Sequence, residues 1–128
     1  MNALAVDQHQ SIVVVEDDAG MSKAIERLLR AAGFQAVSFT SAEEMLRTDA
    51  ADSAACLVLD IHLPGISGLE LGRLLITSGR TKPFIFITGQ DEPSLRDEVQ
   101  RLGCAYFRKP FEGKAFLEAI RAVLTADP

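Results

Sequence analysis

Five residues with chemically active side chains each follow a short, mostly apolar run of the sequence. They are Glu16, Asp17, Asp60, Thr88 and Lys109. Carboxylates that meet at one place repel one another and are difficult to keep ionised together, and a divalent cation removes that repulsion. A set of oxygen ligands that also needs phosphate oxygens suits Mg²⁺. These residue types therefore predict a magnesium site at Glu16, Asp17 and Asp60.

The same residues are suited to phosphoryl transfer. An aspartate such as Asp60 can act as a nucleophile and form an acyl phosphate. Phosphoryl transfer depends mainly on in-line positioning and on neutralisation of the phosphoryl charge. Lys109 and the cation would supply the positive charge, and the hydroxyl of Thr88 would donate a hydrogen bond to a phosphoryl oxygen.

Five apolar runs predict the strands that position these residues. The runs do not alternate with polar residues, which is typical of strands covered on both faces. Amphipathic stretches lie between them, and this alternation predicts a parallel, doubly wound α/β sheet. The predicted strands cover 11–15, 35–39, 54–59, 84–87 and 105–108. Three predicted helices cover 21–32, 41–48 and 93–102, and two more carry their apolar residues within 69–75 and 116–124. In such a sheet the functional crevice lies beyond the carboxyl ends of the strands, which is where the five candidate residues fall.

Local signals predict several helix ends. Ser41 and Glu44 have the spacing of a capping box, and Pro93 suits the first position of a helix. Gly33 and Gly103 each follow a helical pattern and are predicted to end it.

Length and composition predict one domain with a real hydrophobic core. The sequence has 128 residues, 48% of them hydrophobic, and a net charge of −5. We expect a flexible polar leader at 1–10 and a single domain at 11–126. The negative charge disfavours direct nucleic-acid binding by this domain. Cys56 and Cys104 lack metal-site spacing and are expected to be small buried hydrophobes.

The sequence also carries no sign of a membrane segment. No apolar run approaches the roughly 18–20 residues of a membrane span. The first ten residues lack the pattern of a secretory signal. We therefore expect a cytoplasmic protein that does not contact a membrane.

Four short motifs, taken together and in order, resemble the receiver domain of two-component response regulators. The motifs are Glu16-Asp17-Asp18, Asp60 with Pro64-Gly65-x-x-Gly68, Ile-Thr88-Gly89 and Lys109-Pro110-Phe111. The similarity covers about residues 11–125 and is greatest to receivers of LuxR- and FixJ-type transcriptional regulators. It implies a flavodoxin-like (βα)5 fold, a doubly wound parallel five-stranded sheet with strand order 2-1-3-4-5.

The resemblance also implies a metal site built around the phosphoacceptor. Asp60 matches the phosphoacceptor and is one of the metal ligands. Asp17 matches a direct ligand of Mg²⁺, for which Mn²⁺ can substitute, and Glu16 matches a residue that acts through a water molecule. The backbone carbonyl of His62 falls where the family supplies a further ligand.

Four more positions match residues of the family that contact the phosphoryl group, respond to it or shape the backbone beside it. Thr88 and Lys109 match the residues that contact it. Tyr106 matches an aromatic switch residue that turns inward when Thr88 is recruited. The bond between Lys109 and Pro110 matches one that is cis in the family, at the modest energy that X–Pro bonds allow.

The function implied by the resemblance is that of a phosphorylated switch. A sensor histidine kinase would donate the phosphoryl group to Asp60, and the change in conformation would control an output, transcription through a DNA-binding domain absent from this chain. Such a domain promotes its own phosphorylation and dephosphorylation but is not a turnover enzyme. A homodimer through the face of the fourth helix and fifth strand is the other partner that the resemblance allows.

Several residues have a second interpretation. Asp18 could be a metal ligand, although a residue that enters the loop or caps the next helix is favoured. His62 could be a metal ligand or acid–base group, but an exposed loop histidine is favoured because no partner ligand is nearby. Tyr106 could be a plain core aromatic. The thin apolar stripe of the helix at 93–102 indicates either a weakly packed surface helix or part of a partner surface.

Three rival functions remain on the sequence alone. A haloacid-dehalogenase-type phosphohydrolase would need a second aspartate two residues after Asp60, where this chain has His62. A flavodoxin-like electron carrier would need a hydroxyl- and glycine-rich loop after the first strand, where this chain has acidic residues. A receiver-like docking module that is never phosphorylated would not need the full acidic set.

Overall fold

The computed structural model describes residues 10–79, 82–102 and 104–125. Within them, five parallel strands form one sheet in the order β2-β1-β3-β4-β5. The strands are β1 (Ser11–Val15), β2 (Gln35–Phe39), β3 (Cys56–Asp60), β4 (Phe84–Thr88) and β5 (Ala105–Arg108). The predicted fold class and strand order are confirmed. The predicted leader up to residue 9, the helix stop at Gly103 and the predicted domain end at 126 lie outside the described residues.

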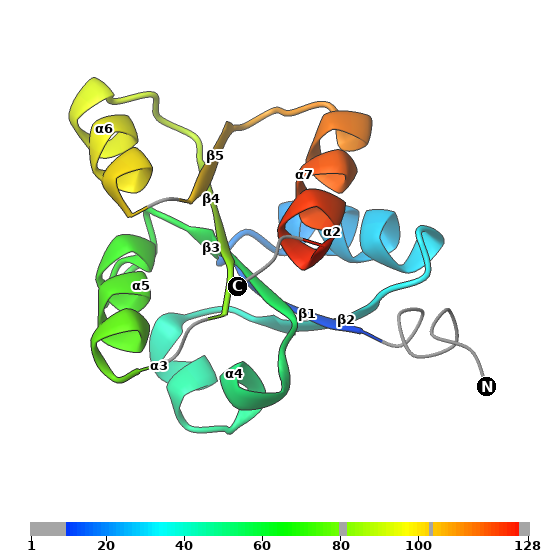
Figure 1. The fold of residues 1–128 in the computed structure, drawn as a ribbon, viewed down its shortest axis with the longest axis horizontal. Coiled ribbons are helices and arrows are strands. Elements are labelled where there is room, and N and C mark those ends of the chain that lie inside the picture. Colours follow the sequence, from blue (N-terminus) through cyan, green and yellow to red (C-terminus); the bar gives the residue numbers. More distant parts are fainter. Residues whose placement is uncertain (1–9, 80–81, 103, 126–128) are drawn as a thin grey trace.

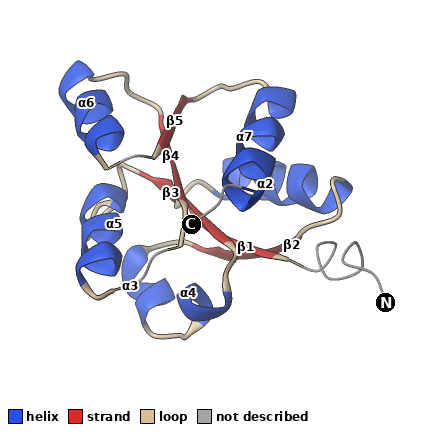
Figure 2. Ribbon diagram, in the orientation of Figure 1, coloured by secondary structure: helices blue, strands red, loops and turns tan. Residues whose placement is uncertain are grey.

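Helices cover both faces of this sheet (Figure 1). On one face lie α2 (Ala19–Ala31) and α7 (Gly113–Thr125), and on the other lie α3 (Ala42–Leu46), α4 (Ala50–Ser53), α5 (Gly68–Thr77) and α6 (Pro93–Arg101). Figure 2 shows the same three layers by element type. The short helix α4 was not predicted, because a single helical turn carries no readable hydrophobic period.

The central strands supply the core on both sides of the sheet. All of β3 and β4 is buried, as is β1 after its first residue. Successive side chains of a strand point to opposite faces, and here both sets are apolar. One face gathers Val13, Val15, Leu57, Leu59 and Phe86, and the opposite face gathers Ile12, Val14, Val58, Ile85 and Ile87. This packing fixes the strand ends that carry the polar candidates.

The helix ends agree in part with their predicted signals. Asp18 is the N-cap of α2 and accepts a hydrogen bond from the Met21 N–H at 3.0 Å, which supports the capping interpretation of this residue. Gly33 has a φ of 95° where the helix ends, a backbone conformation that glycine adopts without strain. Pro93 is the first residue of α6, as predicted.

The predicted capping box at Ser41 is only half formed. The Ser41 hydroxyl accepts from the Glu44 N–H at 3.0 Å, but the Glu44 carboxylate accepts from the Thr40 N–H at 2.8 Å instead of closing back on Ser41. The complete capping box lies at the start of α5, between Ser67 and Glu70. Both sites have the required spacing, and only the geometry of the entering chain distinguishes them.

The remaining global expectations concern cysteines and membranes. Cys56 is buried, Cys104 is partly buried and neither forms a disulfide. Burial raises the pKa of the Cys56 thiol to about 12. Among the described residues, no helix has both the length and the apolar character needed to cross a membrane.

Candidate functional site

The polar ends of four strands meet at one edge of the sheet. Glu16 follows β1, Asp60 ends β3, Thr88 ends β4 and Lys109 follows β5. Because these strands are parallel and paired in the order β1-β3-β4-β5, their carboxyl ends lie side by side. The Lys109 N–H donates to the Thr88 carbonyl oxygen at 2.7 Å, which holds the end of β5 against β4.

Three carboxylates gather at this edge. Oxygen atoms of Glu16, Asp17 and Asp60 all lie within 4.8 Å of one another. Glu16 and Asp60 are buried, with 1% and 3% exposure, whereas Asp17 is exposed. A set of carboxylate oxygens that is open on one side fits a hard cation that keeps some of its water, which is the coordination that Mg²⁺ prefers. The predicted acidic residues are thus brought together, and their chemistry fits the expected metal.

Lys109 reaches into the same cluster from β5. Its Nζ donates to Glu16 Oε1 at 2.8 Å and to Asp60 Oδ2 at 3.2 Å. The ammonium therefore bridges the carboxylates of β1 and β3 and lies beside the expected nucleophile. The peptide bond between Lys109 and Pro110 is cis.

Burial of these charges shifts their protonation. Burial raises the pKa of Glu16 from 4.5 to about 7; the hydrogen bond from Lys109 lowers it less than burial raises it, and the nearby Asp60 raises it further. For Lys109, burial works toward a lower pKa, but the hydrogen bond to Glu16 and the charge of Asp60 outweigh it and raise the pKa. A cation at this edge would favour the ionised form of Glu16 and remove the cost of clustering the acids.

The loop that follows Asp60 folds back on it. The His62 N–H donates to Asp60 Oδ1 at 3.0 Å, and the Gly68 N–H donates to the Ile61 carbonyl oxygen at 3.0 Å. A Cβ atom at Gly68 would lie 2.0 Å from the Asp60 carbonyl oxygen, so only glycine allows this approach. The backbone around the expected nucleophile is therefore closely packed.

The side chain of His62 lies apart from the three clustered carboxylates. Its imidazole is 38% exposed and its Nε2 lies 3.6 Å from Glu92 Oε1. Within the described part of the chain, His62 is not a member of the cluster that could hold a metal ion. The structure thus favours an exposed loop histidine over a metal-binding side chain.

Thr88 is buried and satisfied within its own loop. Its hydroxyl donates to the Gln90 carbonyl oxygen at 2.9 Å and accepts from the Gln90 N–H at 3.0 Å. Because the hydroxyl both donates to and accepts from Gln90, it would have to break these bonds to contact a phosphoryl group.

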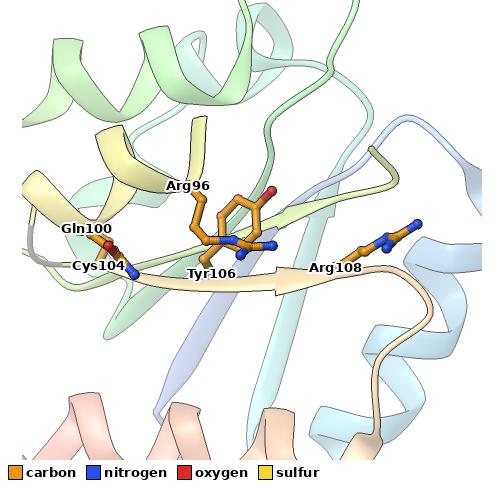
Figure 3. Close-up of a pocket in the computed structure, with 5 residues that line it drawn as sticks. All are labelled: Arg96, Gln100, Cys104, Tyr106 and Arg108. Carbon is orange, nitrogen blue, oxygen red and sulfur yellow. The ribbon is translucent and has the colours of Figure 1, made fainter. Parts of the chain in front are cut away.

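Tyr106 belongs to β5 and lines a hollow of about 360 Å³ beside α6 (Figure 3). Its hydroxyl lies 3.4 Å from Asp91 Oδ1, and the guanidinium of Arg96 lies over its ring, 5.6 Å from the centroid. Arg96 also forms an ion pair with Asp91. Cys104 lines the same hollow. Tyr106 is only partly buried, and its ring packs on the core while its hydroxyl faces these charged residues.

Three residues at the margins of the site were missed in the sequence. Asp91 and Arg96 hold Tyr106, and Glu43 of α3 accepts a hydrogen bond from the Ile66 N–H in the loop after Asp60, at 3.0 Å. None of them carries a motif of its own. These contacts depend on how side chains of separate elements are directed, so spacing alone gives no signal for them.

Comparison with known proteins agrees with this geometry. A family model of the response regulator receiver domain matches residues 12–121. The chain is 38% identical over 117 residues to nodulation protein W of Bradyrhizobium diazoefficiens, covering 91% of this chain and 52% of that protein. It is 36% identical over 112 residues to transcriptional regulatory protein FixJ of Azorhizobium caulinodans, covering 87% and 53%. The chain thus spans about half the length of the curated relatives it matches.

A solved structure shows the same fold. The response regulator receiver protein of Burkholderia phymatum aligns with a TM-score of 0.79 and 39% identity, covering 92% of this chain and 97% of that chain. The family match runs from β1 into α7 and includes every strand end at the acidic edge. The chain therefore belongs to the response regulator receiver domain family.

Proposed function

We propose that Asp60 accepts a phosphoryl group from the phosphohistidine of a sensor histidine kinase. The observation that carries this proposal is the environment of its carboxylate, which lies beside two further acids and within 3.2 Å of the Lys109 ammonium. We further propose that Mg²⁺, or Mn²⁺ in its place, is held by Asp17, Asp60 and the backbone carbonyl of His62, with Glu16 acting through water.

The proposed transfer follows from the charges at this edge. A carboxylate oxygen of Asp60 forms the new bond to phosphorus, the bond from phosphorus to the histidine nitrogen breaks, and its electron pair stays on the imidazole. When bound, the cation supplies positive charge to the phosphoryl oxygens. Lys109 supplies a second positive charge from β5, and the hydrogen bond from the His62 N–H holds the Asp60 carboxylate in place.

The proposed output follows from Thr88 and Tyr106. A phosphoryl group on Asp60 would draw the Thr88 hydroxyl away from Gln90, and Tyr106 would then turn inward and leave Asp91. The phosphoryl group thus shifts a two-state equilibrium by binding one state better than the other. The face of α6 and β5 changes in this transition, and we propose it as the surface for a homodimer.

By analogy with the transcriptional regulator FixJ, we propose that the whole protein controls transcription from the cytoplasm through a separate DNA-binding domain. The receiver itself would not contact nucleic acid, since its charge of −5 opposes phosphate binding. Its reaction would be one phosphotransfer and the hydrolysis of its own acyl phosphate, without turnover of a separate substrate.

Phosphorylation with a small donor tests this function. We expect phosphoramidate with Mg²⁺ to add one phosphoryl group, seen by intact mass spectrometry, and EDTA to prevent it. Asp60→Asn should carry no label, and Asp49→Asn, which changes an exposed aspartate outside the edge, should be labelled like the wild type. A label that persists in Asp60→Asn refutes the assignment.

A further inference from the structure

We propose that Glu43 is a positioning residue for phosphorylation, which acts by holding the loop after Asp60 from the neighbouring helix α3. This inference rests on the proposed function of Asp60. Glu43 does not touch the reacting atoms. Its carboxylate accepts a hydrogen bond from the Ile66 N–H and lies against Gly65, and through this backbone it would fix where the His62 carbonyl and the Asp60 carboxylate lie.

The contact is specific and built for a carboxylate. Glu43 Oε2 accepts a hydrogen bond from the Ile66 N–H at 3.0 Å, across 23 residues of sequence. Gly65 has a φ of 74°, and a Cβ atom there would lie 2.3 Å from Glu43 Oε2. Glycine therefore serves twice, since it permits the backbone conformation and leaves room for the carboxylate.

The loop transmits this contact to the phosphoacceptor because both of its ends are pinned. At the start, the Ile61 N–H donates to the Ile87 carbonyl oxygen at 2.9 Å. At the end, Gly68 donates to Ile61 and lies against the Asp60 carbonyl with no room for a Cβ atom. With the ends fixed, the hydrogen bond to Glu43 is the contact that holds the middle of the loop. Loss of this bond would therefore allow the His62 carbonyl to move.

Glu43 has no need of this contact to support its own helix. The cap of α3 is the Ser41 hydroxyl, which accepts from the Glu44 N–H, and the Glu44 carboxylate turns back to Thr40. Glu43 instead reaches out of α3. Hydrogen bonds from the Ile66 N–H and from its own N–H hold the pKa of Glu43 below its usual value, so the acceptor stays charged and strong at neutral pH.

The test compares two neighbouring glutamates of one helix. Glu43→Ala removes the contact to the loop, Glu43→Gln keeps an acceptor oxygen without the charge, and Glu44→Ala disturbs only the start of α3. Phosphoramidate labelling is measured over a range of Mg²⁺ concentrations. We expect Glu43→Ala to raise the half-saturating Mg²⁺ concentration about tenfold, as is typical when a residue that supports a metal site is lost. Glu43→Gln should lie between it and the wild type, and Glu44→Ala should match the wild type.

A second measurement needs no metal and no phosphorylation. In the metal-free protein the Ile66 amide proton should show the downfield NMR shift and slow exchange of a bond to a carboxylate. Both should be lost in Glu43→Ala and kept in Glu44→Ala, with both variants folded by circular dichroism.

The outcomes separate the two proposals. If the wild type takes no label, the function proposed for Asp60 fails and the positioning role fails with it. If the wild type is labelled and Glu43→Ala has the same Mg²⁺ dependence, the positioning role is overturned while the function stands. Equal losses in Glu43→Ala and Glu44→Ala would also overturn it, because they would trace the effect to the stability of α3.

Discussion

The two loops beside Asp60 are held in place in different ways. The loop from β3 to α5 is tied at Gly68, at the Ser67 capping box and, through Ile66, to Glu43. In the loop from β4 to α6, Thr88 bonds to Gln90, and the contacts to other elements are made by the exposed or partly buried side chains of Asp91 and Glu92. This loop opens a helix that buries only Val99 and has no side-chain cap.

Under the proposed function, this difference separates the loop beside the reacting carboxylate from the loop that carries the proposed switch residue Thr88. Phosphoryl transfer needs groups held in place before the reaction, which favours a tied loop. A switch needs an element with low local stability, and few buried contacts provide that. The face of α6 and β5, where Tyr106 meets charged residues, has these few buried contacts and is therefore suited to the proposed switch.

The largest expected effect is a difference in stability between substitutions at two glycines, Gly68 at the end of the first loop and Gly89 in the second. Gly68→Ala places a Cβ atom against the Asp60 carbonyl oxygen, whereas nothing lies within 4 Å of a Cβ atom at Gly89. We expect Gly68→Ala to lower the free energy of unfolding by about 3 kcal/mol, and Gly89→Ala to change it by less than about 0.5 kcal/mol. Urea unfolding measures both. Similar values for the two variants would contradict the contrast between the loops.

The next effect concerns how the stability of the protein depends on pH through Glu16, which lies beside Asp60 at the end of β1. Because folding raises the pKa of Glu16 from 4.5 to about 7, the folded metal-free chain keeps a proton that the unfolded chain has released. Its stability should therefore fall as the pH rises through this interval, and level off above it.

Mg²⁺ should have the opposite dependence, because it favours ionised Glu16. We expect its affinity to rise about tenfold between pH 6 and pH 8, as protons stop competing for a group with a pKa near 7. Titration calorimetry in buffers of different ionisation enthalpy would show the released proton. An affinity that is the same at both pH values would contradict this role of Glu16.

A smaller effect is expected from the two helix caps. Ser67→Ala removes the hydroxyl that accepts from the Glu70 N–H, while the Ser67 N–H can still donate to the Glu70 carboxylate. The loss of this cap should lower the free energy of unfolding by about 1 kcal/mol. Glu92 is the N-cap of α6 but makes no side-chain cap bond, so Glu92→Ala should change it by less than about 0.5 kcal/mol. Thermal unfolding of both variants provides the comparison, and a larger loss in Glu92→Ala would reverse the ranking of the two helices.

Arg96→Ala is expected to have the smallest effect on stability but a clear effect on the fluorescence of Tyr106. Arg96 is an exposed residue that pairs with Asp91 and lies over the Tyr106 ring. Its loss should leave the unfolding midpoint unchanged and alter the surroundings of Tyr106. The chain has one tyrosine and no tryptophan, so its intrinsic fluorescence reports on Tyr106 directly. An unchanged emission spectrum in Arg96→Ala would show that Arg96 does not hold the ring.

The sequence predicted the parts of this molecule that depend on local patterns. The buried strands are short apolar runs that end in a polar residue. Parallel topology brings those ends together, so the sequence predicted that Asp60 and Lys109 would meet at one edge of the sheet. The strand order came from the resemblance to receiver domains and not from the pattern itself.

The parts that were missed depend on contacts between side chains of separate elements. Nothing in the spacing distinguishes Glu43, which binds the loop after Asp60, from Glu44, which turns back to Thr40. The same holds for Arg96 and Tyr106, whose contact depends on how α6 lies on β5. Side-chain direction decides these contacts, and it is fixed only when the elements are packed.

The unequal burial of the two cysteines makes the chain suitable for site-selective labelling. Cys56 lies inside the sheet with a pKa of about 12, so its thiolate is scarce and inaccessible. Cys104 is partly exposed and lines the hollow beside Tyr106. Within the described residues, a thiol-reactive dye should therefore attach at Cys104 and leave Cys56 unmodified. Such a dye would provide an optical readout of the α6 and β5 face without any substitution in the chain.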